Sequence, residues 1–163
     1  MSVRTWRAEP HEAETVARLL VAFRDHHGRD WPSDNAFLAG VERLIETQEC
    51  EFLLAAPDDD SPPLGVCQIR FRFGIWHASI DCWLEDLFVM EEARGAGLGR
   101  ALVEAVFESA RARGSRRVEL DVSEANEAAL ALYRSLGFGF KSEPHRDLLM
   151  RRRLGDEHDA QPG

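Results

Sequence analysis

The sequence is poor in cysteine, and its cysteines are not paired. Cys50, Cys67 and Cys82 stand singly along 163 residues. A disulfide framework is typical of an even set of cysteines and a zinc site of closely spaced ones, so we expect neither. Cys67 and Cys82 fall in strand-like runs and are predicted to be small residues of the core. No bound metal is expected.

Long apolar runs are absent as well. No stretch approaches the roughly 18 consecutive apolar residues that a membrane-spanning helix needs. Residues 1–6 lack the apolar core of a signal peptide. We therefore expect a cytoplasmic protein with no membrane partner.

Positive charge is scarce. The chain has 20 Lys and Arg against 29 Asp and Glu, for a formal net charge of -9. A general nucleic-acid-binding protein usually presents a basic face, so we expect no nucleic-acid partner. The acidity fits a protein that receives a cationic substrate, and it is also a common means of keeping a surface soluble.

The hydrophobic pattern predicts one domain of strands and helices. Apolar residues alternate at period two in short runs and recur at helical spacing in longer ones, with Gly and Pro between them. We expect an α/β (α+β) fold over residues 1–154 and a disordered polar tail over 155–163. The predicted strands are 3–7, 51–56, 64–73, 80–90, 116–122 and a terminal hairpin of 139–142 and 147–153. The predicted helices lie between Pro10 and Gly28, from Ser33 or Asp34 through 37–45, over 98–113, and between Asn126 and Leu136.

Residues 84–100 are the most informative stretch. A strand is followed by a glycine-rich turn at 94–99 and then by a helix. A glycine loop at a helix N-terminus presents backbone N–H groups to an anion, and the helix dipole adds partial positive charge. Gly97 and Gly99 let the backbone approach a phosphate closely, and Arg94 adds charge. We predict a phosphate-binding site here.

Two common glycine loops fit this turn less well. A Walker A loop ends in Gly-Lys-Ser/Thr, whereas Gly99 is followed by Arg100 and Ala101, so that interpretation fails. A dinucleotide fingerprint needs a third glycine at position 100. Because Glu119 and Asp121 lie at a suitable distance along the chain for a ribose contact, the dinucleotide interpretation stays open. A glycine turn that simply starts a helix is the remaining alternative.

The turn instead follows the pattern Arg-x-x-Gly-x-Gly at residues 94–99, preceded by a hydrophobic-x-Val pattern at 87–89. A second motif, Asn-x-x-Ala followed by Tyr and Gly-Phe, occupies residues 126–138. With both motifs at this spacing, the chain resembles the GNAT superfamily of acyl-CoA-dependent N-acetyltransferases over about residues 64–140.

This resemblance implies a GNAT fold, with a central mixed, mostly antiparallel twisted sheet of about six to seven strands and about four flanking helices. It also implies acetyl-CoA as the co-substrate and a homodimer as the assembly. The residues that it places at the coenzyme are Leu87, Phe88, Val89, Arg94, Gly95, Ala96, Gly97, Leu98, Gly99, Arg100, Asn126, Ala129 and Tyr133.

Acetyl transfer to an amine requires a base, because an alkylammonium with a pKa near ~10 must lose a proton before it attacks. Glu85 lies two residues before Leu87, and strand alternation places both on one face, so we assign Glu85 as the base, acting directly or through a water. The same alternation places Asp86 on the opposite face unless a bulge intervenes. Tyr133, the single tyrosine, matches the tyrosine that acts as general acid in the family.

The sequence indicates less clearly which amine accepts the acetyl group. Residues 83–90 are most similar to the diamine and polyamine (spermidine/spermine-type) branch, which carries a Leu-Glu-Asp-x-x-Val block. We expect a transferase acting on a primary amine of a small molecule, a diamine, polyamine or amino-acid-like compound, with Glu85, Asp86 and Trp31 as substrate contacts. Residues 26–32, with two adjacent histidines, fit a substrate-facing loop or a polar helix end. The alternatives are an aminoglycoside or a protein N-terminal or lysine amine as acceptor, and a non-catalytic acyl-CoA-binding module.

Overall fold

The computed structural model describes residues 2–141 and 144–155. The chain divides into two compact units, Met1–Asp121 and Val122–Gly163, and each is described by itself. The predicted tail, 155–163, lies outside the described residues apart from Gly155. The single domain predicted for 1–154 stays a prediction.

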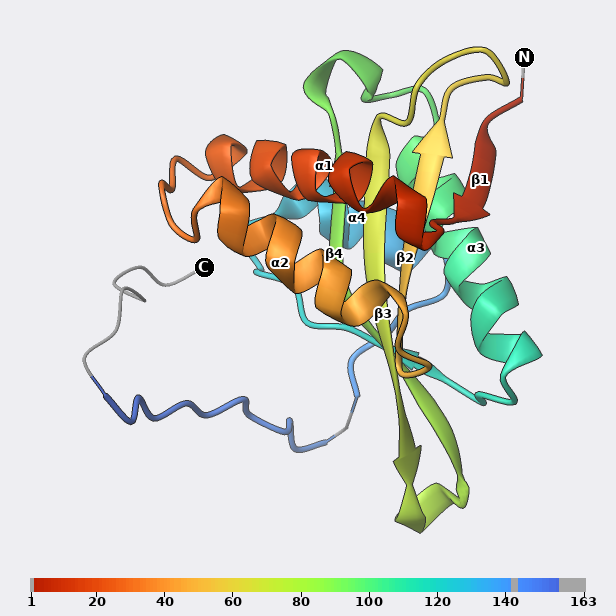
Figure 1. Ribbon diagram of the computed structural model, residues 1–163. Helices are drawn as coiled ribbons and strands as arrows, with labels where there is room; N and C mark the ends of the chain where they lie inside the picture. Colours follow the sequence, from red (N-terminus) through yellow and green to blue (C-terminus); the bar gives the residue numbers. More distant parts are fainter. Residues whose placement is uncertain (1, 142–143, 156–163) are drawn as a thin grey trace. The chain divides into compact units, whose positions relative to one another are not determined.

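The first unit is built on a five-stranded sheet with the strands in sequence order. Neighbouring strands are antiparallel, except that β4 and β5 are parallel. The parallel pair follows from the strand–loop–helix–strand order of residues 79–119, because such a crossover returns the chain in the same direction. The strands are β1 (Arg4–Arg7), β2 (Cys50–Ala56), β3 (Gly65–Gly74), β4 (Ser79–Val89) and β5 (Val118–Glu119) (Figure 1).

The prediction of six to seven strands is wrong, because the terminal hairpin does not form in the described residues. Residues 139–141 and 147–153 carry no strand, and 142 lies outside the described part. The apolar side chains here are largely exposed, from 68% for Phe140 to 88% for Met150. Residues 148–153 are three apolar residues followed by three arginines, so they lack the alternation that would let a strand bury one face.

The four α-helices occur where the sequence predicts them. They are α1 (Ala13–His26), α2 (Asp34–Ile45), α3 (Leu98–Ala112) and, in the second unit, α4 (Glu127–Ser135). Side-chain oxygens cap two of them: Ser33 accepts from the N–H of Ala36 at the start of α2, and Asn126 accepts from the N–H of Ala129 at the start of α4. None of the helices in the described part of the chain is long and apolar enough to cross a membrane.

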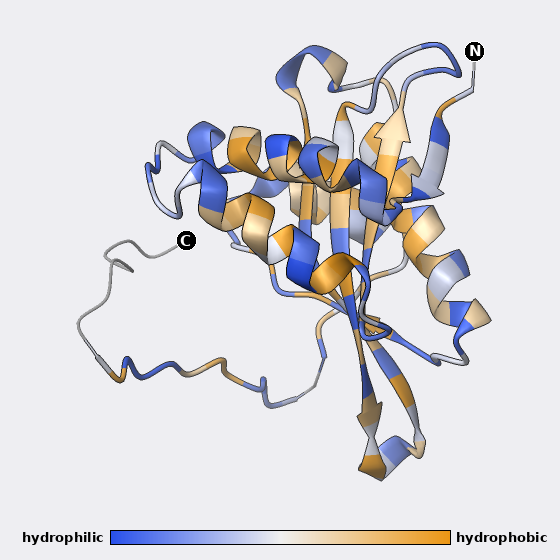
Figure 2. Cartoon of the chain, in the orientation of Figure 1, coloured by the Kyte–Doolittle hydropathy of each residue, from blue (hydrophilic) through white to orange (hydrophobic). Residues whose placement is uncertain are grey.

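Helices cover both faces of the sheet (Figure 1). On one face, Val66 and Phe88 join a buried cluster with residues of α1 and α2, and Phe88 stacks on Phe23 with ring centroids 5.0 Å apart. On the other face, Leu102 of α3 lies so close to Gly65 that an added Cβ would come within 3.1 Å of it. Hydrophobic and hydrophilic segments alternate along α1, α2 and the strands, as expected of elements that bury one face (Figure 2).

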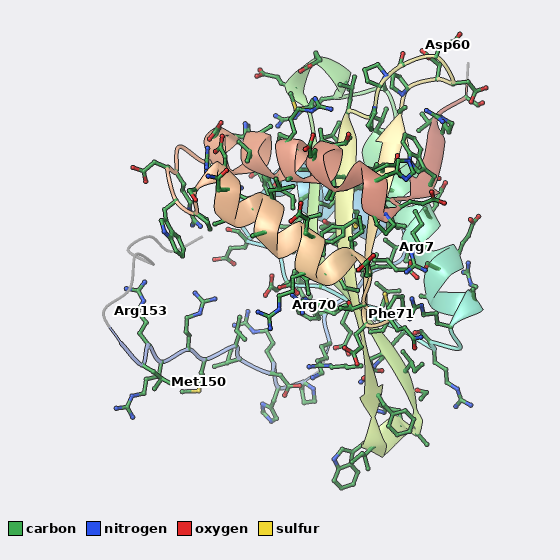
Figure 3. All side chains as sticks on the ribbon, in the orientation of Figure 1. Arg7, Asp60, Arg70, Phe71, Met150 and Arg153 are labelled. Carbon is green, nitrogen blue, oxygen red and sulfur yellow. The ribbon has the colours of Figure 1, made fainter. Side chains whose placement is uncertain are left out.

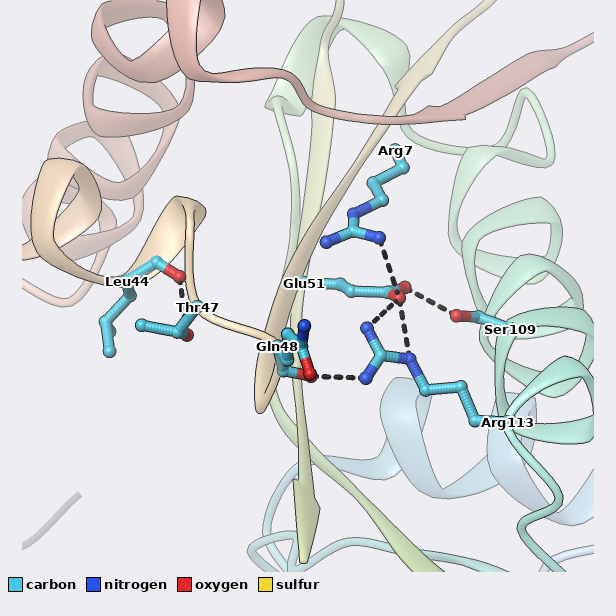
Figure 4. Close-up of polar contacts among 7 residues, drawn as sticks. All are labelled: Arg7, Leu44, Thr47, Gln48, Glu51, Ser109 and Arg113. Atoms are coloured by element: carbon cyan, nitrogen blue, oxygen red, sulfur yellow. Dashed lines mark hydrogen bonds and ion pairs between the residues drawn. The ribbon is translucent and has the colours of Figure 1, made fainter.

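A buried carboxylate anchors α3 to the sheet. Glu51 of β2 is 5% exposed. It accepts hydrogen bonds from the guanidinium of Arg113, at 2.7 and 3.1 Å, and from the hydroxyl of Ser109. Arg7 of β1 lies 3.4 Å away, and Arg113 also donates to the carbonyl of Gln48 (Figure 4). These contacts hold the C-terminal end of α3 and leave its N-terminal end facing the end of β4.

Candidate functional site

The C-terminal half of β4 has one edge without a strand partner among the described residues. β5 pairs only with Cys82 and Trp83. The N–H of Met90 donates to the carbonyl of Leu64, before β3, at 2.8 Å. Because backbone groups alternate in direction along a strand, Leu87 and Val89 direct their N–H and carbonyl groups away from β3. This edge can therefore accept an extended, amide-containing ligand.

The glycine turn follows directly after β4. Gly95 and Gly97 have φ values of +80° and +87°, in the left-handed region that favours glycine. No side chain caps Gly97, the N-cap residue of α3, so the first-turn N–H groups of α3 have no acceptor within the helix. A Cβ on Gly95 would meet nothing within 4 Å, and one on Gly97 only Val3 at 4.0 Å. The turn is an open cradle lined by backbone donors, which fits a phosphate group.

Arg94 ties this turn to its surroundings. Its Nε donates to the carbonyl of Val89 at 3.2 Å, and its guanidinium lies 6.0 Å from the ring of Phe88. One Nη lies 3.4 Å from Nε2 of His26, at the end of α1. The sequence places His26 in a polar segment but does not predict this contact, since 68 residues separate the partners.

A β-bulge brings two carboxylates to one face of the sheet. Asp86 pairs with Gln68 and Leu84 with Ile69, so Glu85 is the extra residue. Gln68 and Arg70 alternate with Ile69 and so share the face of Val66, which α1 and α2 cover. The carboxylate of Glu85 lies 3.8 Å from Nε of Arg70, labelled in Figure 3.

This bulge changes the predicted arrangement. The alternation that places Glu85 with Leu87 and opposite Asp86 is wrong here, because the extra residue shifts the register by one. Leu87 pairs with Cys67 and so belongs to the face that α3 covers, whereas Glu85 and Asp86 share the other face. Nothing in the sequence marks the bulge, since neither glycine nor proline occurs in β4.

The surroundings of Asp86 raise its pKa. Burial raises the pKa of Asp86 to about 6, and the neighbouring charges of Glu85 and Asp121 add to this increase. Arg70 acts in the opposite direction. A carboxylate with a pKa near 6 can accept a proton efficiently near neutral pH. The site thus has a concentration of negative charge that a cationic group would relieve.

The remaining predicted residues lie between α1 and α2 or in the second unit. Trp31 is 50% exposed, in the segment between α1 and α2. Asn126, Ala129 and Tyr133 belong to the second unit, where Asn126 caps α4 and Tyr133 is buried against Phe138, with ring centroids 5.5 Å apart. Within the described residues, no cluster of three or more His, Cys, Asp or Glu side chains could hold a metal ion.

The sequence is similar to those of known acetyltransferases. Thialysine N-epsilon-acetyltransferase of Bos taurus is 31% identical over 114 residues, which cover 59% of this chain and 64% of the relative. Mycothiol acetyltransferase of Nocardioides sp. is 32% identical over 148 residues, which cover 85% of this chain and 50% of the relative. The chain therefore spans less than two thirds of the length of these curated relatives.

A crystal structure described as that of "a probable acetyltransferase" superposes with a TM-score of 0.83 at 26% identity, covering 94% of this chain and 99% of the other. The model of the acetyltransferase (GNAT) family matches residues 13–138, more than half of the sequence. The glycine cradle and the open edge of β4 both lie within that match. This chain belongs to the acetyltransferase (GNAT) family.

Proposed function

We propose that this chain is an N-acetyltransferase that moves an acetyl group from acetyl-CoA to a primary amine of a small molecule. The observation that carries the proposal is the order of features along β4. A carboxylate pair at the bulge is followed by the open edge at Leu87 and Val89, and then by the glycine cradle. An amine, an acyl arm and a phosphate group can bind in that order along a single strand.

The cradle and the open edge fit the coenzyme, which the family uses in the form of acetyl-CoA. Acetyl-CoA would supply the activated acetyl thioester. Open space over Gly95 and Gly97 leaves room for a pyrophosphate against the backbone donors. The N–H and carbonyl of Leu87 and the N–H of Val89 would pair with the pantetheine arm and donate to the reacting carbonyl oxygen, while the carbonyl of Val89 stays bound to Arg94. The proposed coenzyme contacts are Leu87, Phe88, Val89, Arg94, Gly95, Ala96, Gly97, Leu98, Gly99, Arg100, Asn126, Ala129 and Tyr133.

The carboxylate pair would handle the amine. We assign Glu85 as the general base, directly or through a water, and Asp86 as the group that attracts the ammonium. Above pH 6 Asp86 is ionised, so it adds negative charge beside the ion pair of Glu85 and Arg70. A diamine, polyamine or amino-acid side chain that brings positive charge would gain from this field. The similarity to the Bos taurus relative, a thialysine N-epsilon-acetyltransferase, supports this acceptor class.

Further assignments complete the proposal. Tyr133 would act as general acid for the departing thiolate, and Trp31 would contact the acceptor. A cytoplasmic location and a homodimeric assembly are part of the same proposal, and both derive from the sequence and the family.

The test is thiol release from acetyl-CoA across a panel of amines: spermidine, putrescine, thialysine and lysine, an aminoglycoside and a short peptide. We expect release with one or more of the small flexible amines. Release with the aminoglycoside or the peptide alone would show that the acceptor is not a small flexible amine, while acetyl transfer from acetyl-CoA would still hold. Tight binding of acetyl-CoA in calorimetry without release from any amine would favour a binding module, and absence of binding would refute the proposal.

A further inference from the structure

His26 and Arg94 meet at the edge of the glycine cradle in a way that fixes the state of the imidazole. Arg94 is always charged and can only donate hydrogen bonds. The ring nitrogen that faces it, Nε2 at 3.4 Å, must therefore act as the acceptor. An imidazole that makes this contact carries its proton on Nδ1.

The surroundings of His26 are cationic or apolar. The glycine turn contributes Arg94, and β4 contributes the ring of Phe88 at 5.9 Å. The ring of His27, the residue after α1, lies 5.8 Å away. The pKa of His27 is lowered, chiefly by burial.

The nearby acidic side chains are engaged elsewhere. Asp25 and Asp34 both bind the guanidinium of Arg24, at 2.7 and 2.8 Å. A proton added to His26 in the free protein would thus place a second cation beside Arg94. An anion bound beside both side chains would reverse that cost, because the imidazolium would then become a second donor to the anion.

We propose that His26 is a binding residue of the phosphate cradle, which takes up a proton when the phosphate groups of coenzyme A bind beside Arg94. This inference rests on the proposed function, which supplies the anionic ligand. Binding of the ligand and protonation of His26 then favour each other by the same factor. Coenzyme binding becomes tighter as the pH falls from 8 toward 6. Imidazole is the side chain whose charge ordinarily changes in this range.

The test is isothermal titration calorimetry of coenzyme A binding near neutral pH, in two buffers that differ in ionisation enthalpy. The difference in the heats gives the number of protons taken up. We expect uptake on the order of a few tenths of a proton in the wild type, and an affinity on the order of threefold higher at pH 6 than at pH 8. His26→Gln, whose side-chain oxygen can still accept from Arg94 but cannot be protonated, should lose most of both effects.

Two controls separate other sources of protons. His11→Gln changes another exposed histidine, which lies 3.4 Å from Glu9, and should leave the uptake unchanged. Dephospho-coenzyme A keeps the pyrophosphate but lacks the terminal phosphate, which itself titrates with a pKa near ~6. With this ligand, the wild type should still take up more protons on binding than His26→Gln does.

Each outcome decides the matter. Equal proton uptake in the wild type and in His26→Gln would overturn the inference while leaving coenzyme binding intact, as would binding of the wild type without uptake. Failure of the wild type to bind coenzyme A at all would refute the proposed function itself, and the inference with it.

Discussion

Replacement of Asp86 by asparagine is expected to stabilise the protein at neutral pH. The ordinary pKa of an aspartate is 3.8, and burial together with Glu85 and Asp121 raises that of Asp86 to about 6. Between these two values the folded state binds more protons than the unfolded state. The free energy of unfolding therefore falls as the pH rises through this range.

The size of this effect follows from the two pKa values. A difference of about 2 between the folded and unfolded states corresponds to about 3 kcal/mol of unfolding free energy above pH 6. Asparagine has nearly the same shape as aspartate and carries no charge, so Asp86→Asn should recover most of that cost at about pH 7.5. At about pH 4, where Asp86 is protonated in the folded state, the gain should be small.

Urea unfolding followed by tryptophan fluorescence measures this gain. All four tryptophans lie in residues 1–121, so the signal reports the unit that contains β4. Asp81→Asn is the matched control, because Arg117 lowers the pKa of Asp81 and its ionised form stabilises the fold. That variant should be less stable than wild type at about pH 7.5. An Asp86→Asn protein no more stable than wild type at this pH would show that the buried charge is not a cost to the fold.

Three further substitutions test the proposed roles. Gly97→Ala should weaken coenzyme A binding by about tenfold, because the alanine must hold a φ of +87° and its Cβ would enter the cradle. Calorimetry measures the affinity, and an unaltered value would exclude Gly97 from the phosphate site. Glu85→Gln should lower kcat/KM by about a hundredfold, most strongly at low pH where few amines are unprotonated, and a pH–rate curve identical to wild type would remove Glu85 as base. Tyr133→Phe should lower kcat by at least about tenfold with coenzyme affinity little changed, and unchanged turnover would remove Tyr133 as acid.

Much of the first unit could be predicted from local sequence. The helix over Leu98–Ala112 and the strand over Gly65–Gly74 lie within one residue of their predicted bounds, because hydrophobic periodicity and flanking glycines define them. The period-two pattern of β3 places Cys67, Ile69 and Phe71 on the inner face, and all three are buried. It fails at Gln68, which is buried as well, and at Phe73, which is 66% exposed near the tip of the hairpin.

The features that the sequence did not predict depend on contacts between distant residues. The bulge at Glu85 arises from the register in which β3 and β4 pair, and no residue type in β4 indicates it. The contact of Arg94 with His26 requires α1 to end beside the glycine turn, which no local pattern specifies. The terminal hairpin was predicted over 139–142 and 147–153, but the apolar residues of its second strand form a block rather than an alternating pattern.

The open edge of β4 has a further consequence, for aggregation. Unpaired N–H and carbonyl groups in the body of a sheet are a template for a strand of another molecule. Here the open stretch is short, and two carboxylates begin it at Glu85 and Asp86. Arg94 ends it by occupying the carbonyl of Val89. An incoming strand would meet charged side chains at both ends of this stretch. The narrow pantetheine arm of the coenzyme need only reach the backbone groups of Leu87 and Val89. The same side chains that we assign to the amine and the phosphate thus also keep this edge from pairing with a second chain.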